Sequence, residues 1–348
     1  MARATSIVNW LVPVALVAGG WTGAWGVIME APGYTAESMT TYALPFASAP
    51  TAMTFASDGQ LYVSHNSSAL STNNGAVYRV DSSWNASRWV TGLVRPEHMA
   101  WGGGTTYGNH LYVVEGYKTP YTRYDGQVTR VSLSGQKTPF CTEWLDQPVS
   151  IGFDRSGNYG GSMFVGLGDS DGIMWVDTSG HTSWLKYFGE SGSGSPIDIE
   201  IESDPQGRFG GHMYVATWYD QPHLTGILRF DSDGSFTRVL EGISGARDLA
   251  FDESSAQLFG GDMYVFGTLQ GEANYKLYRI TPEGDITLFA RGLSYYTAMT
   301  FGPDGALYLA ELKSGNVAEI TRIIPEPATL LVLGLGGLAL VRRRRRRA

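Results

Sequence analysis

Short apolar runs recur along the chain at an interval of about fifty residues. One run is an apolar-aromatic-apolar triplet, found at residues 61–63, 111–113, 163–165, 213–215, 263–265 and 307–309. A phrase of five residues ending in an aromatic residue or Ile precedes each triplet, at residues 51–55, 97–101, 149–153, 197–201, 247–251 and 297–301. Short runs of β-branched and aromatic residues bounded by Gly, Asp, Asn or Pro predict β-strands.

Two further runs follow each of the first five pairs, and one further run follows the sixth. The third lies at residues 76–80, 127–131, 172–176, 226–230, 276–280 and 316–320. The fourth lies at residues 87–93, 138–145, 182–188, 236–242 and 286–292. Four strands in each of six units of about fifty residues predict an all-β fold, a six-bladed β-propeller with four-stranded blades.

The sixth unit lacks a fourth run of its own. Residues 41–46 (TYALPF) precede the first five-residue phrase as residues 286–291 precede the last one. We therefore expect an N-terminal strand to complete the last blade and close the ring, which removes two exposed sheet edges. The propeller is predicted to span residues 40–324, with residues 25–39 as a linker.

Both ends of the chain have the pattern of targeting segments. Residues 1–24 predict a signal peptide with a helical apolar stretch: Arg3 is followed by apolar residues 7–20 and by small residues up to Ala24. A retained membrane anchor or a buried helix is the alternative. At the other end, residues 328–341 are apolar or small and predict a short transmembrane helix of about 21 Å.

The C-terminal helix is framed by two short motifs. Pro325, Glu326 and Pro327 precede it, and it is followed by Arg342, Arg343, Arg344, Arg345, Arg346 and Arg347. Residues 325–348 resemble the PEP-CTERM sorting signal. The resemblance implies a Gram-negative-type bacterium, processing by an exosortase and an association with exopolysaccharide production. A plain tail anchor is the alternative.

The predicted location follows from these two ends. The positive-inside rule keeps the arginines cytoplasmic and places the body on the far side of the membrane. We expect an exported protein of the cell envelope or extracellular matrix that is transiently membrane-anchored, with exosortase and the export machinery as partners.

Composition supports this picture and excludes some functions. The formal net charge is −8, but without Arg3, the six terminal arginines and Glu326 the body carries 18 basic and 32 acidic residues, a net charge of −14. A body this acidic lacks the excess of basic residues that binding to nucleic acid requires, and it suits cation binding. The single cysteine excludes an intramolecular disulfide and Cys-rich metal sites.

The body resembles the NHL-type, gluconolactonase-type and sugar-dehydrogenase propellers. Residues 301–311 (FGPDGALYLAE) carry a phrase typical of that set. Many propellers share the phrase, so it points to the fold and only weakly to a function.

Candidate chemistry gathers on the five-residue phrases, which are the predicted innermost strands. Their second positions are Ala52, His98, Ser150, Asp198, Asp248 and Ala298, and their fourth positions are Thr54, Ala100, Gly152, Glu200, Ala250 and Thr300. Oxygen-rich side chains suit Ca²⁺ or another divalent cation. We therefore predict a cation held in the channel by Glu97 or His98, Asp198 and Asp248, with Glu200 as a deeper contributor. A water-filled polar channel is the alternative.

Aromatic residues follow the second strands of two units. Trp218, Tyr219 and Tyr117 could stack on sugar rings or could pack on propeller loops.

Two functional interpretations remain open at this stage. The leading one is an exported, exosortase-sorted, non-catalytic binding module of the surface or matrix, with polysaccharide as a candidate ligand. The competing one is a metal-dependent, lactonase-like hydrolase or a sugar oxidoreductase with its site in the channel.

Overall fold

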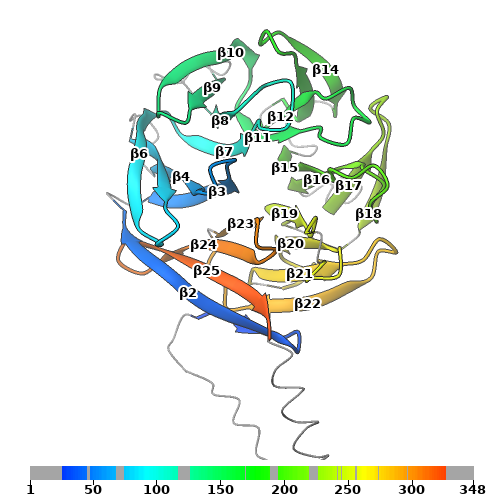
Figure 1. Ribbon diagram of the computed structural model, residues 1–348. Coiled ribbons are helices and arrows are strands. Elements are labelled where there is room, and N and C mark those ends of the chain that lie inside the picture. Colours follow the sequence, from blue (N-terminus) through cyan, green and yellow to red (C-terminus); the bar gives the residue numbers. More distant parts are fainter. Residues whose placement is uncertain are drawn as a thin grey trace, which may run out of the picture.

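A computed structural model describes residues 26–44, 48–67, 74–116, 126–168, 170–188, 195–218, 226–240, 242–243, 245–254, 257–272, 274–295 and 297–326. These residues form six antiparallel sheets arranged as a ring around a central axis (Figure 1). The predicted six-bladed β-propeller with four-stranded blades is therefore confirmed. The predicted signal peptide and the C-terminal helix with its arginines lie outside the described residues.

The four strands of each blade run from the axis outward. The innermost strands are β3 (Ser48–Phe55), β7 (Pro96–Trp101), β11 (Pro148–Phe153), β15 (Ser195–Ile201), β19 (Asp248–Phe251) and β23 (Thr297–Phe301). The second strands are β4 (Leu61–Ser67), β8 (His110–Glu115), β12 (Met163–Leu167), β16 (Met213–Trp218), β20 (Met263–Gly267) and β24 (Leu307–Lys313).

The outer half of each blade follows the same order. The third strands are β5 (Gly75–Val80), β9 (Gly126–Ser132), β13 (Gly172–Val176), β17 (Gly226–Phe230), β21 (Lys276–Ile280) and β25 (Val317–Pro325). The outermost strands are β6 (Ala86–Leu93), β10 (Lys137–Leu145), β14 (Thr182–Tyr187), β18 (Phe236–Leu240), β22 (Ile286–Arg291) and β2 (Tyr34–Ala43).

The N-terminal strand closes the ring as predicted. β2 pairs antiparallel with β25 from Tyr34 opposite Pro325 to Ala43 opposite Val317, so the two ends of the chain share the last blade. Figure 1 shows this pairing as a blue strand beside an orange-red one. The long ladder gives the last blade the outer strand that its own sequence lacks.

The boundaries of the propeller differ from those expected. Residues 34–39 belong to β2, and β1 (Ile28–Met29) pairs with β22 as a fifth strand of the preceding blade. Much of the expected linker is thus sheet. At the other end β25 continues through Pro325, and the Glu326 amide donates to the Gly33 carbonyl at 2.8 Å. The repeat pattern of the blades could not reveal either extension, because neither has a counterpart in the other units.

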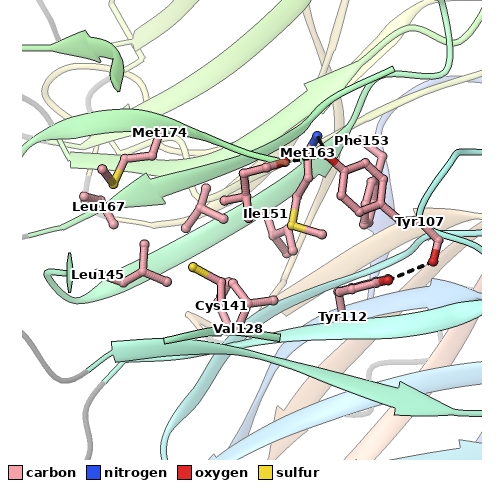
Figure 2. Close-up of a cluster of buried hydrophobic side chains, with 13 residues drawn as sticks. Tyr107, Tyr112, Val128, Cys141, Leu145, Ile151, Phe153, Met163, Leu167 and Met174 are labelled. Atoms are coloured by element: carbon pink, nitrogen blue, oxygen red, sulfur yellow. Dashed lines mark hydrogen bonds between the residues drawn. The ribbon is translucent and has the colours of Figure 1, made fainter. Parts of the chain in front are cut away.

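Apolar side chains fill the spaces between neighbouring blades. Figure 2 shows the cluster between the second and third blades, where Cys141 is buried among aliphatic and aromatic side chains. The Tyr107 hydroxyl donates to the Val176 carbonyl and accepts the Met163 amide at 3.0 Å. In the next interface Tyr159 makes the same two bonds, to Phe230 and Met213. Each tyrosine thus adds polar ties to the apolar contact between blades.

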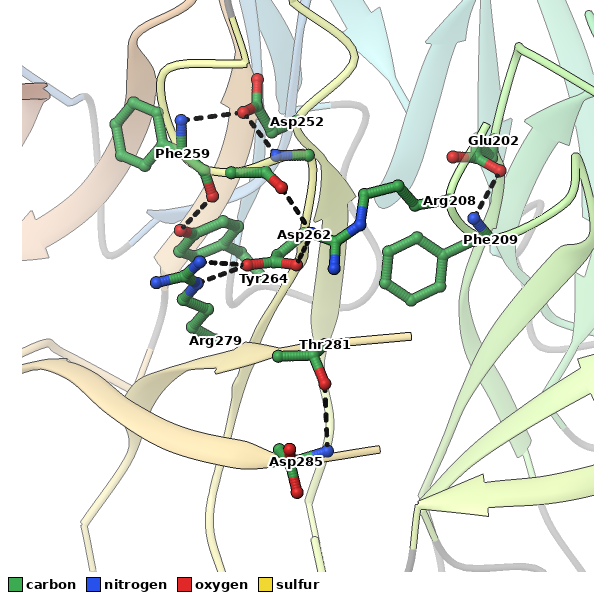
Figure 3. Close-up of polar contacts among 12 residues, drawn as sticks. Glu202, Arg208, Phe209, Asp252, Phe259, Asp262, Tyr264, Arg279, Thr281 and Asp285 are labelled. Carbon is green, nitrogen blue, oxygen red and sulfur yellow. Dashed lines mark hydrogen bonds and ion pairs between the residues drawn. The ribbon is translucent and has the colours of Figure 1, made fainter. Parts of the chain in front are cut away.

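The long loops between the first and second strands have a carboxylate at their centre. The Asp252 carboxylate accepts the amides of Phe259 and Gly261 (Figure 3). Glu202 and Asp154 bind the corresponding loops in their own blades. Gly260 and Gly261 have φ angles of +82° and +64°, a backbone region that other residues adopt at a cost. The paired glycines therefore wrap a loop around a buried anion.

Candidate ligand site in the propeller channel

The innermost strands present two layers of side chains to the axis. Residues two apart on a strand share a face, so the second and fourth positions of each phrase point the same way. The six fourth-position side chains all line a hollow of about 680 Å³ at one end of the channel. Residues of the loops between the first and second strands, among them Arg155 and Asp304, complete its wall.

The second-position residues form a separate layer that links the blades. Asp198 is fully buried, and its Oδ2 accepts the Leu249 amide of the next blade at 2.7 Å. Asp248 Oδ2 accepts the Met299 amide of the following blade at the same distance. These carboxylates therefore replace part of the main-chain pairing that neighbouring blades lack.

An imidazole from across the ring joins this layer. His98 Nε2 lies 3.1 Å from Asp198 Oδ1, which also accepts the Ile199 amide. We call His98, Asp198 and Asp248 the channel cluster. Burial raises the pKa of Asp248 well above its usual value, and the negative charge of Asp198 raises it further. A proton on the Asp248 carboxyl relieves this repulsion.

Glu97 lies apart from the channel cluster. Its carboxylate forms an ion pair with Arg95 and accepts a hydrogen bond from Asn66 Nδ2 at 3.4 Å. Burial raises the pKa of Glu97, while the Arg95 guanidinium opposes that shift. Its partners show that Glu97 serves a local ion pair.

The predicted metal ligands are thus divided among three places. Across the described part of the chain, no three His, Cys, Asp or Glu side chains are grouped so that they could hold a metal ion. The structure brings His98, Asp198 and Asp248 together, but places Glu97 with Arg95 and Glu200 in the hollow. Cation binding by these residues stays a prediction.

The hollow has an aromatic wall. Its aromatic members are the last residues of five innermost strands: Phe55, Trp101, Phe153, Phe251 and Phe301. The repeat itself contained this signal, since each five-residue phrase ends in an aromatic residue or Ile. The hollow itself was not predicted from the sequence, because five small fourth-position residues reveal a space only after the ring is assembled.

Most ionisable groups in the wall already have partners. Arg155 donates to the carbonyls of Trp101 and Gly103. Glu253 accepts the amide and hydroxyl of Ser203. Asp304 binds Arg322 and accepts the Tyr308 hydroxyl at 2.9 Å.

Glu200 differs from these wall residues. Among the residues described, its carboxyl has no hydrogen-bond or ion-pair partner. Burial raises the pKa of Glu200 well above its usual value, Asp198 and Glu253 add to that shift, and the Arg155 guanidinium opposes it.

None of the three aromatic residues proposed from sequence to stack on sugars has a described side chain. Tyr117 and Tyr219 are outside the described residues. Trp218 ends β16, at the opposite end of its blade from the loops that line the hollow, and its side chain is not among those described. Their role in binding stays a prediction.

Fold and channel define an all-β six-bladed propeller with a polar layer across its axis. A model of the PEP-CTERM protein-sorting motif matches residues 324–346. This match confirms the motif predicted at the C-terminus. It implies export, transient membrane anchoring and processing by an exosortase.

Solved structures share the fold at low sequence identity. One described as a candidate gluconolactonase has a TM-score of 0.57 and 14% identity, over 85% of this chain and 94% of the other. A Bacteroides thetaiotaomicron protein of unknown function has a TM-score of 0.56 and 11% identity, over 83% and 76%. A calcium-binding regucalcin from Agrobacterium tumefaciens gives 0.43 and 13%, over 82% and 80%.

These likenesses extend to the fold alone, because identity is low in every case. No curated protein matches the chain. In the described residues no helix has the length and apolar character needed to cross a membrane.

Proposed function

We propose that this exported propeller is a non-catalytic binding module of the cell surface or extracellular matrix, and that its ligand is a polysaccharide. One observation carries the proposal: the acids and the imidazole of the channel cluster bind one another and the amides of neighbouring blades. A general acid or base must exchange a proton with its substrate. Side chains committed to the joints between blades are poorly suited to that task.

The sorting signal supports the proposed location. Export and exosortase processing place the propeller outside the cytoplasm, where polysaccharide is an abundant ligand. A ring of rigid blades is also a suitable scaffold for recognition, because it fixes side chains from several strands around one axis.

The competing interpretation is a hydrolase or oxidoreductase in the channel. The shared fold with a candidate gluconolactonase keeps a lactonase-like activity as the alternative outcome. Such an enzyme would need a cation or cofactor, together with a group free to accept or donate a proton, and among the described residues of the hollow Glu200 is the carboxyl that could do so.

A paired binding and turnover experiment separates the two. The exported protein is incubated with exopolysaccharide from its own host, and co-sedimentation is measured with calcium and with chelator. In parallel, the same preparation is assayed for hydrolysis of gluconolactone and for sugar-dependent dye reduction. We expect retention on the polysaccharide under both conditions without turnover. Turnover that Asp198→Asn abolishes, or a failure to bind polysaccharide, would contradict the proposal.

A further inference from the structure

The hollow exists because of a size pattern around the ring. At the fourth position, five innermost strands carry Thr54, Ala100, Gly152, Ala250 and Thr300, all of them small. Glu200 alone extends a longer side chain at that level. At the second position the larger His98 and Asp198 meet across the ring. Glu200 is therefore the single long fourth-position side chain that lines the hollow.

The volume and the wall fit a ligand of defined size and chemistry. About 680 Å³ lies within the range of roughly 300–1,000 Å³ that is usual for small-molecule sites. Phenylalanine and tryptophan edges in the wall offer apolar surface. Hydroxyls of Thr54 and Thr300 and the amide of Asn109 offer donors and acceptors. A saccharide unit has both apolar C–H faces and hydroxyl groups.

Charge around the hollow favours a neutral ligand. Arg155 and Glu253 carry opposite charges close enough to interact, and Asp304 is paired with Arg322, so these groups largely offset one another. Glu200 is the ionisable group of the hollow without such a partner among the described residues. Its raised pKa favours the protonated carboxyl, which offers one donor and one acceptor. Two neighbouring hydroxyl groups of a sugar can hydrogen-bond with this donor and this acceptor.

We infer that the hollow binds one or two units of a neutral saccharide and that the Glu200 carboxyl hydrogen-bonds the sugar hydroxyls at its inner end. The inference rests on the proposed function and deepens it. It assigns recognition to the end of the channel where the first and second strands connect. Trp218, which ends β16 at the opposite end of the blade, is then not a principal contact.

Binding of simple sugars tests this assignment. The exported protein is titrated with glucose, galactose, mannose, maltose and cellobiose by calorimetry, and the best ligand is carried forward. Glu200→Ala removes the donor and the acceptor, and we expect affinity to fall at least tenfold. Glu200→Gln keeps both in a neutral group of the same shape, and affinity should stay within threefold. Glu143→Ala, an exposed acid on the outer strand β10, is the matched control and should change nothing.

The pH dependence adds a readout that a structural role of Glu200 would not move. Ionisation removes the carboxyl donor, so wild-type affinity should fall as pH rises through the raised pKa of Glu200, whereas the affinity of Glu200→Gln should stay level. An affinity that rises with pH would mean that the carboxylate binds a cation, and it would overturn the inference.

The remaining outcomes separate this inference from the proposed function. If Glu200→Ala binds the simple sugars and the polysaccharide like wild type, the hollow is not the site, and the binding module stands. If no sugar of the panel binds while polysaccharide is still retained, the inference again fails alone. If simple sugars bind through Glu200 but polysaccharide is not retained, the hollow is a sugar site and the matrix role is wrong.

Discussion

Asp198 and Glu200 stand two residues apart on β15, and their side chains share one face of the strand. Asp198 is fully buried and bound to His98, the Ile199 amide and the Leu249 amide. Glu200 lines the hollow without a hydrogen-bond or ion-pair partner among the described residues. Two acids on the same strand thus have opposite surroundings.

The difference arises from the other five blades. At the level of Asp198 the ring supplies His98, Asp248 and a neighbouring main-chain amide within reach. At the level of Glu200 it supplies small side chains and therefore space. Strand position sets where an acid points, while the residues across the axis decide whether it joins blades or meets a ligand.

Removing Asp198 should have the largest effect. Asp198→Ala leaves the buried Leu249 amide without its acceptor and His98 without its carboxylate, so we expect unfolding free energy to fall by about 3 kcal/mol. Glu200→Ala should cost less than about 0.5 kcal/mol, because it breaks no hydrogen bond within the described structure. Denaturant unfolding of both variants at pH 7 measures the contrast.

Asp198→Asn is the control for that experiment. It keeps an oxygen for the Leu249 amide and should recover more than half of the loss. Equal costs for Asp198→Ala and Glu200→Ala would show that the two acids do not differ as described.

The fold was largely predictable because it repeats. Six copies of four runs fix strand number and blade order, and the missing fourth run of the last unit predicts closure by the N-terminus. β1 and the extension of β25 to Pro325 were not predictable, because each occurs once and has no repeated partner to reveal it.

For the site, the sequence could predict only which residues lie at the same level of the channel. The alignment of units put His98, Asp198 and Asp248 at one position of the repeat, and these three side chains interact in the structure. It also grouped Glu97 with them, but an adjacent residue on a strand faces the other way, and Glu97 pairs with Arg95. A space left by small residues has no signature in a single unit, so the hollow required the assembled ring.

Stability should depend on pH through the channel cluster. In the folded state the pKa of Asp248 is raised, so the folded protein holds a proton that the unfolded chain releases near pH 4. The stabilisation from this proton is complete below the pKa of Asp248 in the unfolded chain. It is lost as pH rises through the raised pKa of Asp248 in the folded protein. Each unit of raised pKa is worth about 1.4 kcal/mol.

Asp248→Asn isolates this effect. The amide cannot ionise, yet its oxygen can accept the Met299 amide as Asp248 Oδ2 does. We expect the melting temperature of the variant, relative to wild type, to increase as pH rises from 4 to 9. His65 is buried in its neutral form, and burial lowers its pKa to about 3, so its contribution to stability changes with pH in the opposite direction. Taking the difference between the two melting temperatures at each pH cancels this contribution. A constant difference across this range would mean that Asp248 is ionised throughout.

Calcium should produce the smallest effect. An ion held by Asp198 and Asp248 would compete with His98 and with the blade-to-blade amides for carboxylate oxygens that already accept hydrogen bonds. A ligand specific to the folded state adds about 2.7 kcal/mol at a hundredfold excess over its dissociation constant, which a melting experiment resolves easily. In contrast to the cation site predicted from the sequence, we expect calcium, magnesium, manganese and chelator each to leave the wild-type melting temperature unchanged. If calcium instead raises the melting temperature, Asp198→Ala and Asp248→Ala should each abolish that rise. A double variant that loses no more of the calcium response than either single variant would then identify one shared ion. Asp198 would then be a metal ligand. It would differ from Glu200 in its access to a cation, and not in its contacts with neighbouring blades.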